Sequence, residues 1–127
     1  MIQVDHIGVT AKDTRSSAYH LAKILGTSAP VADGPDGDMY RIDFGHGTFV
    51  LFNPIDSEGQ RIDLAHVAFR VTKEQFDTIV GRLKGMGVPF GNRHDDTNNG
   101  QTEDFELGGA GRVYFVDENG HLFEVTC

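Results

Sequence analysis

The segment Leu64-Ala65-His66-Val67-Ala68-Phe69 has the same pattern as Val4-Asp5-His6-Ile7-Gly8-Val9, about 60 residues earlier in the chain. Both segments alternate around a histidine in the way that is typical of a half-buried strand. When these segments are aligned, Gly47–Phe52 in the first copy aligns with Gly120–Val125 in the second. The chain therefore contains an internal duplication of a unit of about 60 residues.

Each copy also contains one predicted helix. The first runs over Arg15–Leu25 behind a cap at Asp13 or Thr14, and Gly26 ends it. The second begins after Thr72, and its apolar positions again fit a period of 3.6 residues until the Gly85-Met86-Gly87 segment. Short strands are expected in the remaining segments, around 28–32, 39–44, 48–52, 88–90, 104–107, 113–116 and 122–126.

This order of elements predicts an α+β fold of two tandem βαβββ modules. A helix covers one face of each sheet, and joining the uncovered faces gives a curved, open barrel-like mixed sheet with the helices outside. We expect a single domain over 1–127, with modules at about 1–54 and 62–127 and a linker over 53–62. The polar, Gly-rich stretch 92–111 is predicted to be a lid or a binding loop.

The composition excludes several classes of protein. A length of 127 residues suits one domain, and a formal net charge of -8 disfavours nucleic acid as a partner. No apolar run is long enough to span a membrane, and we expect no signal peptide. The single cysteine, Cys127, allows no internal disulfide, so we expect a cytoplasmic protein.

Strand alternation predicts that three metal-ligating side chains share the open face of the sheet: His6, His66 and Glu124. Two imidazoles and one carboxylate form a recurring catalytic metal site. The alternative is that each histidine is a half-buried hydrogen-bonding residue. Glu124 lies between apolar residues, where a carboxylate is costly unless it is paired or bound to metal.

Other residues are predicted to line the same cavity. A hairpin turn at residues 117–119 would place Tyr114 beside Glu124, where its phenol could bind a substrate oxygen or act as an acid. Arg70 could neutralise an anionic substrate, while Phe49 and Leu51 would make the cavity partly apolar. The remaining histidines are expected to be surface residues: His20, His46, His94 and His121.

The chain resembles the vicinal oxygen chelate superfamily, which includes glyoxalases, fosfomycin-resistance enzymes, extradiol dioxygenases and bleomycin-resistance proteins. The two histidine segments carry this resemblance together with residues 111–125, which read Gly-Arg-Val-Tyr-Phe-Val-Asp-Glu-Asn-Gly-His-Leu-Phe-Glu-Val. That last stretch is similar to the family's Tyr-Phe-x-Asp-Pro-x-Gly-x-x-x-Glu ending, with Glu118 in place of proline. The resemblance implies one divalent ion per chain, Fe, Mn, Zn or Ni, bound by His6, His66 and Glu124.

Leu51 is an informative departure from the family pattern. Members with four protein ligands carry Glu or Gln where the internal alignment places this leucine, so three ligands remain and more positions are open to water or substrate. This weakens a resemblance to true glyoxalase I. In fosfomycin-resistance enzymes threonine is common at the position of Gly8. Extradiol dioxygenases typically need a further histidine that does not bind the metal, and no position in this sequence securely supplies it.

The sequence therefore predicts a metal-dependent enzyme that acts on a small molecule with two neighbouring oxygens, by glyoxalase-like lyase or isomerase chemistry. Tyr114 and Glu124 are its predicted catalytic residues. Two alternatives stay open: an Fe(II) dioxygenase of the extradiol type, and a non-enzymatic protein that sequesters a drug, as bleomycin-resistance members do. A homodimer is expected, with pairing of the modules within one chain or between two.

Overall fold

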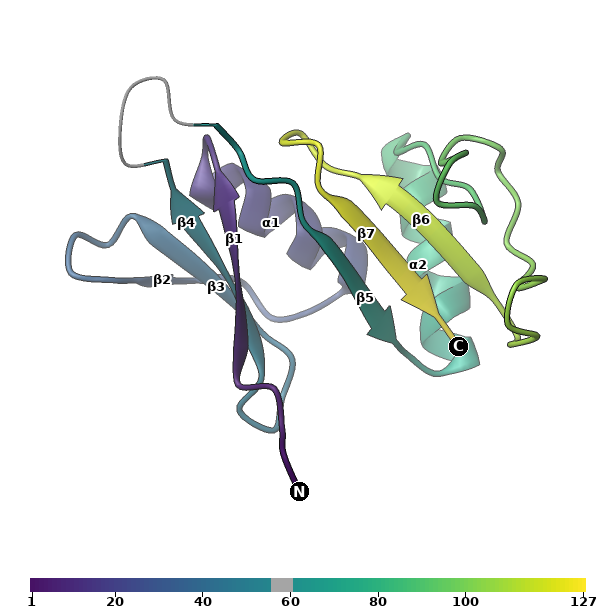
Figure 1. Cartoon of the computed structure of the whole chain (residues 1–127), viewed down its shortest axis with the longest axis horizontal. Coiled ribbons are helices and arrows are strands. Elements are labelled where there is room, and N and C mark those ends of the chain that lie inside the picture. The colour runs from purple at the N-terminus through teal and green to yellow at the C-terminus, as the bar shows by residue number, and fades with distance from the viewer. Residues whose placement is uncertain (56–60) are drawn as a thin grey trace. The chain divides into compact units, whose positions relative to one another are not determined.

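The computed structural model describes residues 1–55 and 61–127 and divides the chain into two compact units, Met1–Leu64 and Ala65–Cys127. Each unit contains one helix and one sheet (Figure 1). Part of the expected linker, residues 56–60, lies outside the described residues. The boundary between the units falls just before the second histidine segment, so each unit corresponds to one copy of the duplication.

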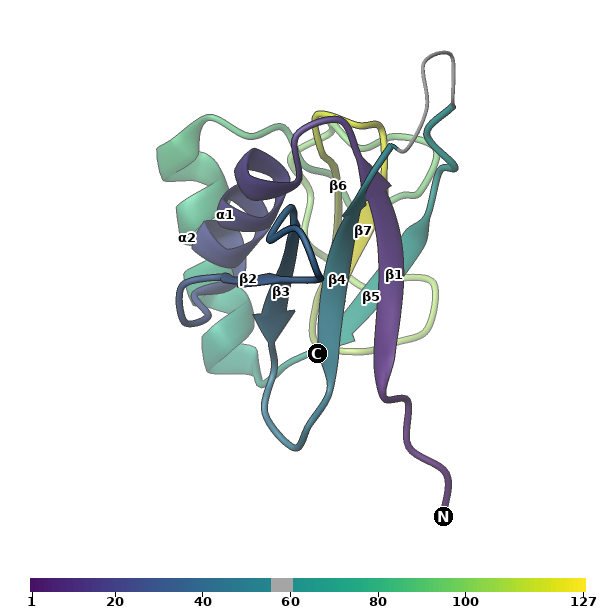
Figure 2. The same ribbon diagram turned by 90° about the vertical axis from the view of Figure 1, so that its left-hand side faces the viewer.

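The first unit has the full βαβββ order. Its sheet has the strand order β1-β4-β3-β2, with β1 parallel to β4 and the other neighbours antiparallel (Figure 2). The elements are β1 (His6–Ala11), α1 (Thr14–Leu25), β2 (Val31–Asp33), β3 (Met39–Asp43) and β4 (Phe49–Pro54).

The second unit repeats this arrangement with one strand fewer. Its sheet has the order β5-β7-β6, with β5 parallel to β7 and β7 antiparallel to β6. The elements are β5 (His66–Arg70), α2 (Lys73–Met86), β6 (Arg112–Val116) and β7 (Leu122–Thr126).

Both helices begin and end where the sequence predicts. The Asp13 side chain accepts a hydrogen bond from the backbone N–H of Ser16 and caps α1. Thr72 and Gln75 form a reciprocal capping box at the start of α2. Gly26 and Gly87 follow the two helices in the left-handed conformation, which a residue without a Cβ adopts without strain.

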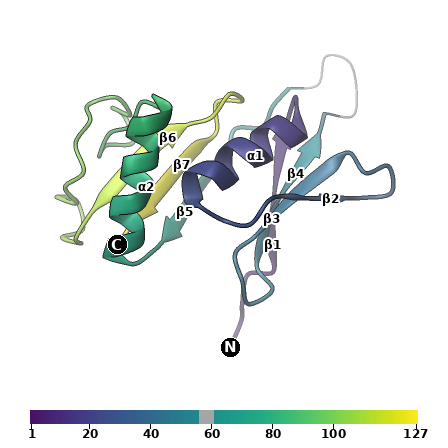
Figure 3. The same cartoon turned by 180° about the vertical axis from the view of Figure 1, so that it is seen from behind.

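In each unit the helix covers one face of the sheet (Figure 3), and the buried side chains of the core lie between them. In the first unit α1 packs on β3 and β4. The fully buried large side chains include Leu21, Ile24, Ile42 and Phe52 in the first unit and Phe76, Leu83, Phe115 and Phe123 in the second. The candidate site residues lie on the opposite face of each sheet, which the helix does not cover.

The predicted α+β fold of two related modules with mixed sheets is confirmed, but two predicted strands are wrong. Residues 88–90 form no strand, since Pro89 has no N–H to donate, and only an isolated bridge joins the following Gly91 to Tyr114. Residues 104–107 form a turn, because the Asp104 carboxylate accepts the backbone N–H of Leu107. Among the described residues, no helix is both long enough and apolar enough to cross a membrane.

Candidate metal centre

The sheet register of the second unit brings three predicted site residues to one face. β5 and β7 run in parallel with Ala68 opposite Glu124, and β6 places Tyr114 opposite Glu124 on the other side. Since alternate residues of a strand share a face, His66 lies on the same face as Ala68. Three neighbouring strands thus present an imidazole, a carboxylate and a phenol together.

His66 and Glu124 contact each other directly. The Nε2 atom of His66 lies 2.8 Å from Oε1 of Glu124. The glutamate is only 6% exposed, whereas the histidine side chain is about half exposed. The second carboxylate oxygen, Oε2, accepts a charge-assisted hydrogen bond from the guanidinium of Arg112. The buried carboxylate is therefore compensated on one side by arginine and presents its other oxygen to an accessible imidazole.

This pair fits a divalent metal ion. Nitrogen and oxygen ligands lie about 2.0–2.2 Å from such an ion, so two ligands of one ion are about 3 Å apart. The distance between Nε2 of His66 and Oε1 of Glu124 agrees with that spacing. Without metal, the Nε2–H donates to the carboxylate, and metal binding displaces this proton. Neutral imidazole and carboxylate are ligands suited to Zn, Fe, Ni or Mn.

The first unit presents the other predicted histidine ligand. The Nδ1 atom of His6 lies 2.7 Å from the Asp5 carboxylate, which can accept a hydrogen bond from Nδ1–H and so leave Nε2 available to a metal. The imidazole stacks on the ring of Phe49, with 4.9 Å between ring centroids and 8° between their planes. A carboxylate and an aromatic ring thus fix the orientation of His6.

Leu51 occupies the place in the first unit that Glu124 occupies in the second. Leu51 pairs with Gly8 of β1, as Glu124 pairs with Ala68 of β5. This register agrees with the internal sequence alignment. Arg41 lies opposite Leu51 on β3, at the position that corresponds to Tyr114. The corresponding face of the first unit therefore carries a cation and an aliphatic side chain instead of a phenol and a carboxylate.

Tyr114 is almost fully buried, and several polar groups surround it. Its ring centroid lies 6.2 Å from that of His66 and 6.5 Å from that of His94. Its hydroxyl makes a long contact of 3.5 Å with the Glu106 carboxylate. Burial first, and then the negative charge of Glu106, raises the pKa of the tyrosine. The phenol is therefore protonated at neutral pH and can donate a hydrogen bond.

The structure brings His66, Glu124 and Tyr114 together in one unit and His6, Phe49 and Leu51 together in the other. Arg70 is exposed at the end of β5, opposite Thr126 and on the same face as His66. The described residues include no group of three or more His, Cys, Asp or Glu side chains arranged to hold a metal ion. Of the three predicted metal ligands, His6 belongs to the first unit, and His66 and Glu124 belong to the second.

Sequence reasoning missed two buried residues beside the site, Arg112 and Asp104. The Arg112 Nε lies 3.0 Å from one oxygen of Asp104, and this ion pair holds the pKa of the Asp104 carboxyl below its usual value. Alternation along β6 could have found Arg112, which is two residues before Tyr114 and shares its face. Nothing in the sequence indicates that a loop aspartate reaches it.

His121 corrects another expectation. It was predicted at the surface, but it is fully buried, and its Nδ1 accepts the backbone N–H of Ala65 at 3.0 Å. It faces away from Glu124, as alternation requires, so it serves the packing of the second unit.

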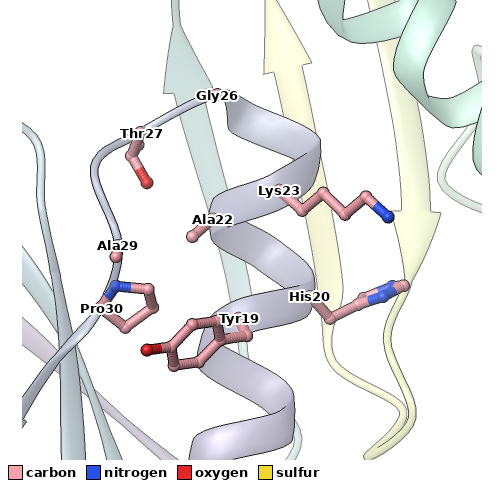
Figure 4. A pocket seen from close by; sticks show the side chains of 8 residues that line it. All are labelled: Tyr19, His20, Ala22, Lys23, Gly26, Thr27, Ala29 and Pro30. Atoms are coloured by element: carbon pink, nitrogen blue, oxygen red, sulfur yellow. The ribbon is translucent and has the colours of Figure 1, made fainter.

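A hollow of about 490 Å³ lies beside the second half of α1, and none of its lining residues is a candidate site residue. Figure 4 shows the Tyr19 ring on one side of the helix and the His20 and Lys23 side chains on the other. The polar groups that line this hollow do not point toward one another. The candidate catalytic and metal-binding side chains therefore lie on the strands and not in this hollow. The lining residues are Tyr19, His20, Ala22, Lys23, Gly26, Thr27, Ala29 and Pro30.

Comparison with known proteins gives several relatives, although no family model matches the chain. Two solved structures are similar over nearly the full length. Oxidase ChaP-H2 is 31% identical, with 98% of this chain and 92% of that chain covered and a TM-score of 0.83. Oxidase ChaP-H1 is 28% identical, with 99% and 95% covered and a TM-score of 0.85.

A curated relative is the fosfomycin resistance protein FosX of Listeria monocytogenes serovar 1/2a (strain ATCC BAA-679 / EGD-e). It is 34% identical over 61 residues, which are 47% of this chain and 38% of that protein, so the match spans well under half of its length. A crystal structure of FosX with Mn(II) and sulfate shares the fold, at 23% identity with 100% of this chain and 91% of that chain covered and a TM-score of 0.67.

The duplicated module, the paired histidine strands and these relatives define the class of this protein. The chain belongs to the vicinal oxygen chelate superfamily. Within that superfamily the chain is similar, at 28% and 31% identity over nearly its full length, to the two ChaP-H oxidases.

Proposed function

We propose that this chain is a divalent-metal-dependent enzyme that acts on a small molecule with two neighbouring oxygens. The observation that carries the proposal is the contact of His66 Nε2 with Glu124 Oε1 on strands whose register repeats that of β1 and β4. His6, His66 and Glu124 would hold one ion per chain. A bound ion supplies Lewis acidity toward the two substrate oxygens and, if it is iron, also electron transfer with dioxygen.

The surrounding residues have distinct proposed roles in binding the substrate. Tyr114 donates a hydrogen bond from its protonated phenol to a substrate oxygen or transfers that proton. Arg70, at the exposed end of β5, neutralises an anionic group. Phe49 and Leu51 give the cavity an apolar wall, and Leu51 leaves a coordination position to the substrate, since leucine cannot ligate.

Two reaction types are candidates for this site. Oxidation by dioxygen is favoured by the two oxidases to which the chain is similar over nearly its full length. It is also favoured by His94, whose ring is close to Tyr114 and which could supply the additional histidine of an extradiol-type site. Glyoxalase-like lyase or isomerase chemistry is favoured by Tyr114 itself, because a buried, protonated phenol can donate a hydrogen bond to a substrate oxygen on which negative charge develops.

Non-enzymatic sequestration of a drug is the weaker alternative. A protein that only encloses an apolar ligand has no need of an accessible imidazole placed beside a buried carboxylate. We propose the cytoplasm as its compartment, because a single cysteine suits a reducing environment.

Metal analysis of protein purified without chelator tests the proposal. We expect about one divalent ion per chain, a large loss of binding in His6→Ala and His66→Ala, and weaker binding in Glu124→Gln, which lacks the ligand charge. His20→Ala on α1 is the matched control and should keep full loading. Full loading of both His6→Ala and His66→Ala would contradict the proposed site, and oxygen consumption by the iron-loaded protein would distinguish oxidation from lyase chemistry.

A further inference from the structure

A buried arginine connects the candidate ligand Glu124 to a loop that is distant in sequence. The guanidinium of Arg112 binds Oε2 of Glu124 on one side. On the other side, its Nε and Nη2 lie 3.0 and 3.3 Å from the two oxygens of Asp104. All three side chains are less than a tenth exposed. One cation is thus shared by two buried carboxylates.

Asp104 also fixes the backbone of its own loop. Its Oδ1 accepts the N–H of Leu107 at 3.1 Å, and its Oδ2 accepts the N–H of Gly109 at 3.1 Å. A Cβ at position 109 would come within 2.6 Å of that carboxylate, so only glycine allows this approach without a shift. The loop 104–109 includes Glu106, whose carboxylate faces the Tyr114 hydroxyl. Hydrogen bonds therefore run continuously from Glu124 to the loop beside Tyr114.

We propose that Arg112 is a positioning residue that restricts Glu124 to ligation through one oxygen and couples the order of the loop 104–109 to metal binding. This inference rests on the proposed function, because it concerns the use of Glu124 as a ligand. It adds a role for Arg112 and Asp104, which do not contact the metal themselves.

The restriction follows from how the two carboxylate oxygens are used. Oε2 accepts a hydrogen bond from Arg112, so only Oε1, which faces His66, is available to an ion. A carboxylate that ligates through one oxygen occupies one coordination position instead of two. A substrate with two neighbouring oxygens needs two adjacent positions, and the arginine keeps one of them open.

The coupling follows from linkage. If the ordered loop holds Asp104 and Arg112 in the arrangement that orients Glu124, the loop favours metal binding, and metal binding must favour the ordered loop by the same factor. The planar guanidinium suits this role because it can bind two carboxylates in fixed directions, which a lysine ammonium cannot do.

Hydrogen exchange of the wild-type protein with and without Zn²⁺ tests the coupling without any variant. We expect Zn²⁺ to slow exchange of the Leu107 and Gly109 amides severalfold, while exchange of the Arg15 amide, at an exposed position in the first turn of α1, stays unchanged. Equal exchange of those two amides with and without bound Zn²⁺ would overturn the coupling. If the wild type binds no metal, the proposed function and this inference fail together.

Variants test the positioning role. We expect Arg112→Met to weaken Zn²⁺ binding by about 10–100-fold in chelator competition, the range found for residues that orient metal ligands. Arg112→Lys should recover part of this loss. Arg93→Lys alters an exposed arginine–aspartate pair of the same loop region, so it is the matched control and should bind as the wild type does.

A spectroscopic measurement separates positioning from stability alone. The visible bands of bound Co²⁺ report coordination number and geometry. In Arg112→Met, release of Oε2 should raise the coordination number and lower the intensity of these bands, and Arg112→Lys should restore them partly. If Arg112→Met does not fold, Asp104→Asn, which keeps the arginine, should show the same change in a smaller degree. Wild-type affinity and spectra in a folded Arg112→Met or Asp104→Asn protein would overturn the positioning role.

Discussion

At the scale of single residues, positions 51 and 124 account for the chemical difference between the two modules. Both lie on the strand that pairs in parallel with the histidine strand, but one is leucine and the other is glutamate. Arg41 lies opposite Leu51 and makes loose ion pairs of 3.6–3.7 Å with Asp33 and Asp43. A glutamate at position 51 would therefore have a cation beside it, as Glu124 has Arg112.

We predict that Leu51→Glu tightens metal binding by about tenfold, equal to about 1.4 kcal/mol, because it adds a charged fourth ligand. Activity on a substrate that needs two coordination positions should fall. Chelator competition measures the affinity, and Leu51→Met, which keeps the size of the side chain without the charge, is the control. An unchanged affinity in Leu51→Glu would mean that this position does not reach the metal.

Single residues also show how far sequence reasoning reaches. The alternation of side chains along a strand predicts that Glu124 and Tyr114 share the face of His66, and the strand register agrees. This could be predicted because successive residues of any strand point to opposite faces of the sheet. The role of Arg112 was missed although its face could have been predicted. Its partner Asp104 belongs to an irregular loop, and no periodic rule predicts which side chain such a loop turns inward.

At the scale of elements, helix boundaries are determined locally and strand boundaries are not. Both caps lie within three residues of the backbone groups that they satisfy, so the sequence contains the complete signal. The expected strand at 104–107 failed because the Asp104 side chain competes for the backbone donors of that segment. Its two apolar residues, Phe105 and Leu107, are 56% and 76% exposed and contribute little to the core.

The capping box of α2 gives a test at this scale. Thr72→Ala should destabilise the protein by about 1 kcal/mol, because the Gln75 backbone N–H loses its partner. The Thr78 hydroxyl, inside the same helix, donates a hydrogen bond to the carbonyl of Glu74. Thr78→Ala should therefore be neutral or stabilising by up to about 0.7 kcal/mol, since alanine has the higher helix propensity. Urea unfolding measures both changes, and equal effects would show that the cap has no special contribution.

At the scale of the whole molecule, we propose that the two modules form one glyoxalase-like domain over residues 1–127 and that the protein is a homodimer. Each module has a sheet with edge strands that are safest when paired. An ion held by His6 of one module and by His66 and Glu124 of another would join modules of one chain or of two chains. In either case it would bind the folded assembly and not the unfolded chain.

Chelation should therefore lower the melting temperature. A ligand that binds only the native state stabilises it by about 2.7 kcal/mol at a hundredfold excess over its Kd. For a domain of this size that corresponds to a shift on the order of 10 °C, which re-addition of metal should restore. Glu124→Gln is the control, since its melt should respond less to chelator. Light scattering should give twice the 13.9 kDa of one chain. A monomeric mass would contradict the dimer, and identical melts of metal-loaded and metal-free wild type would show that the ion does not join the modules.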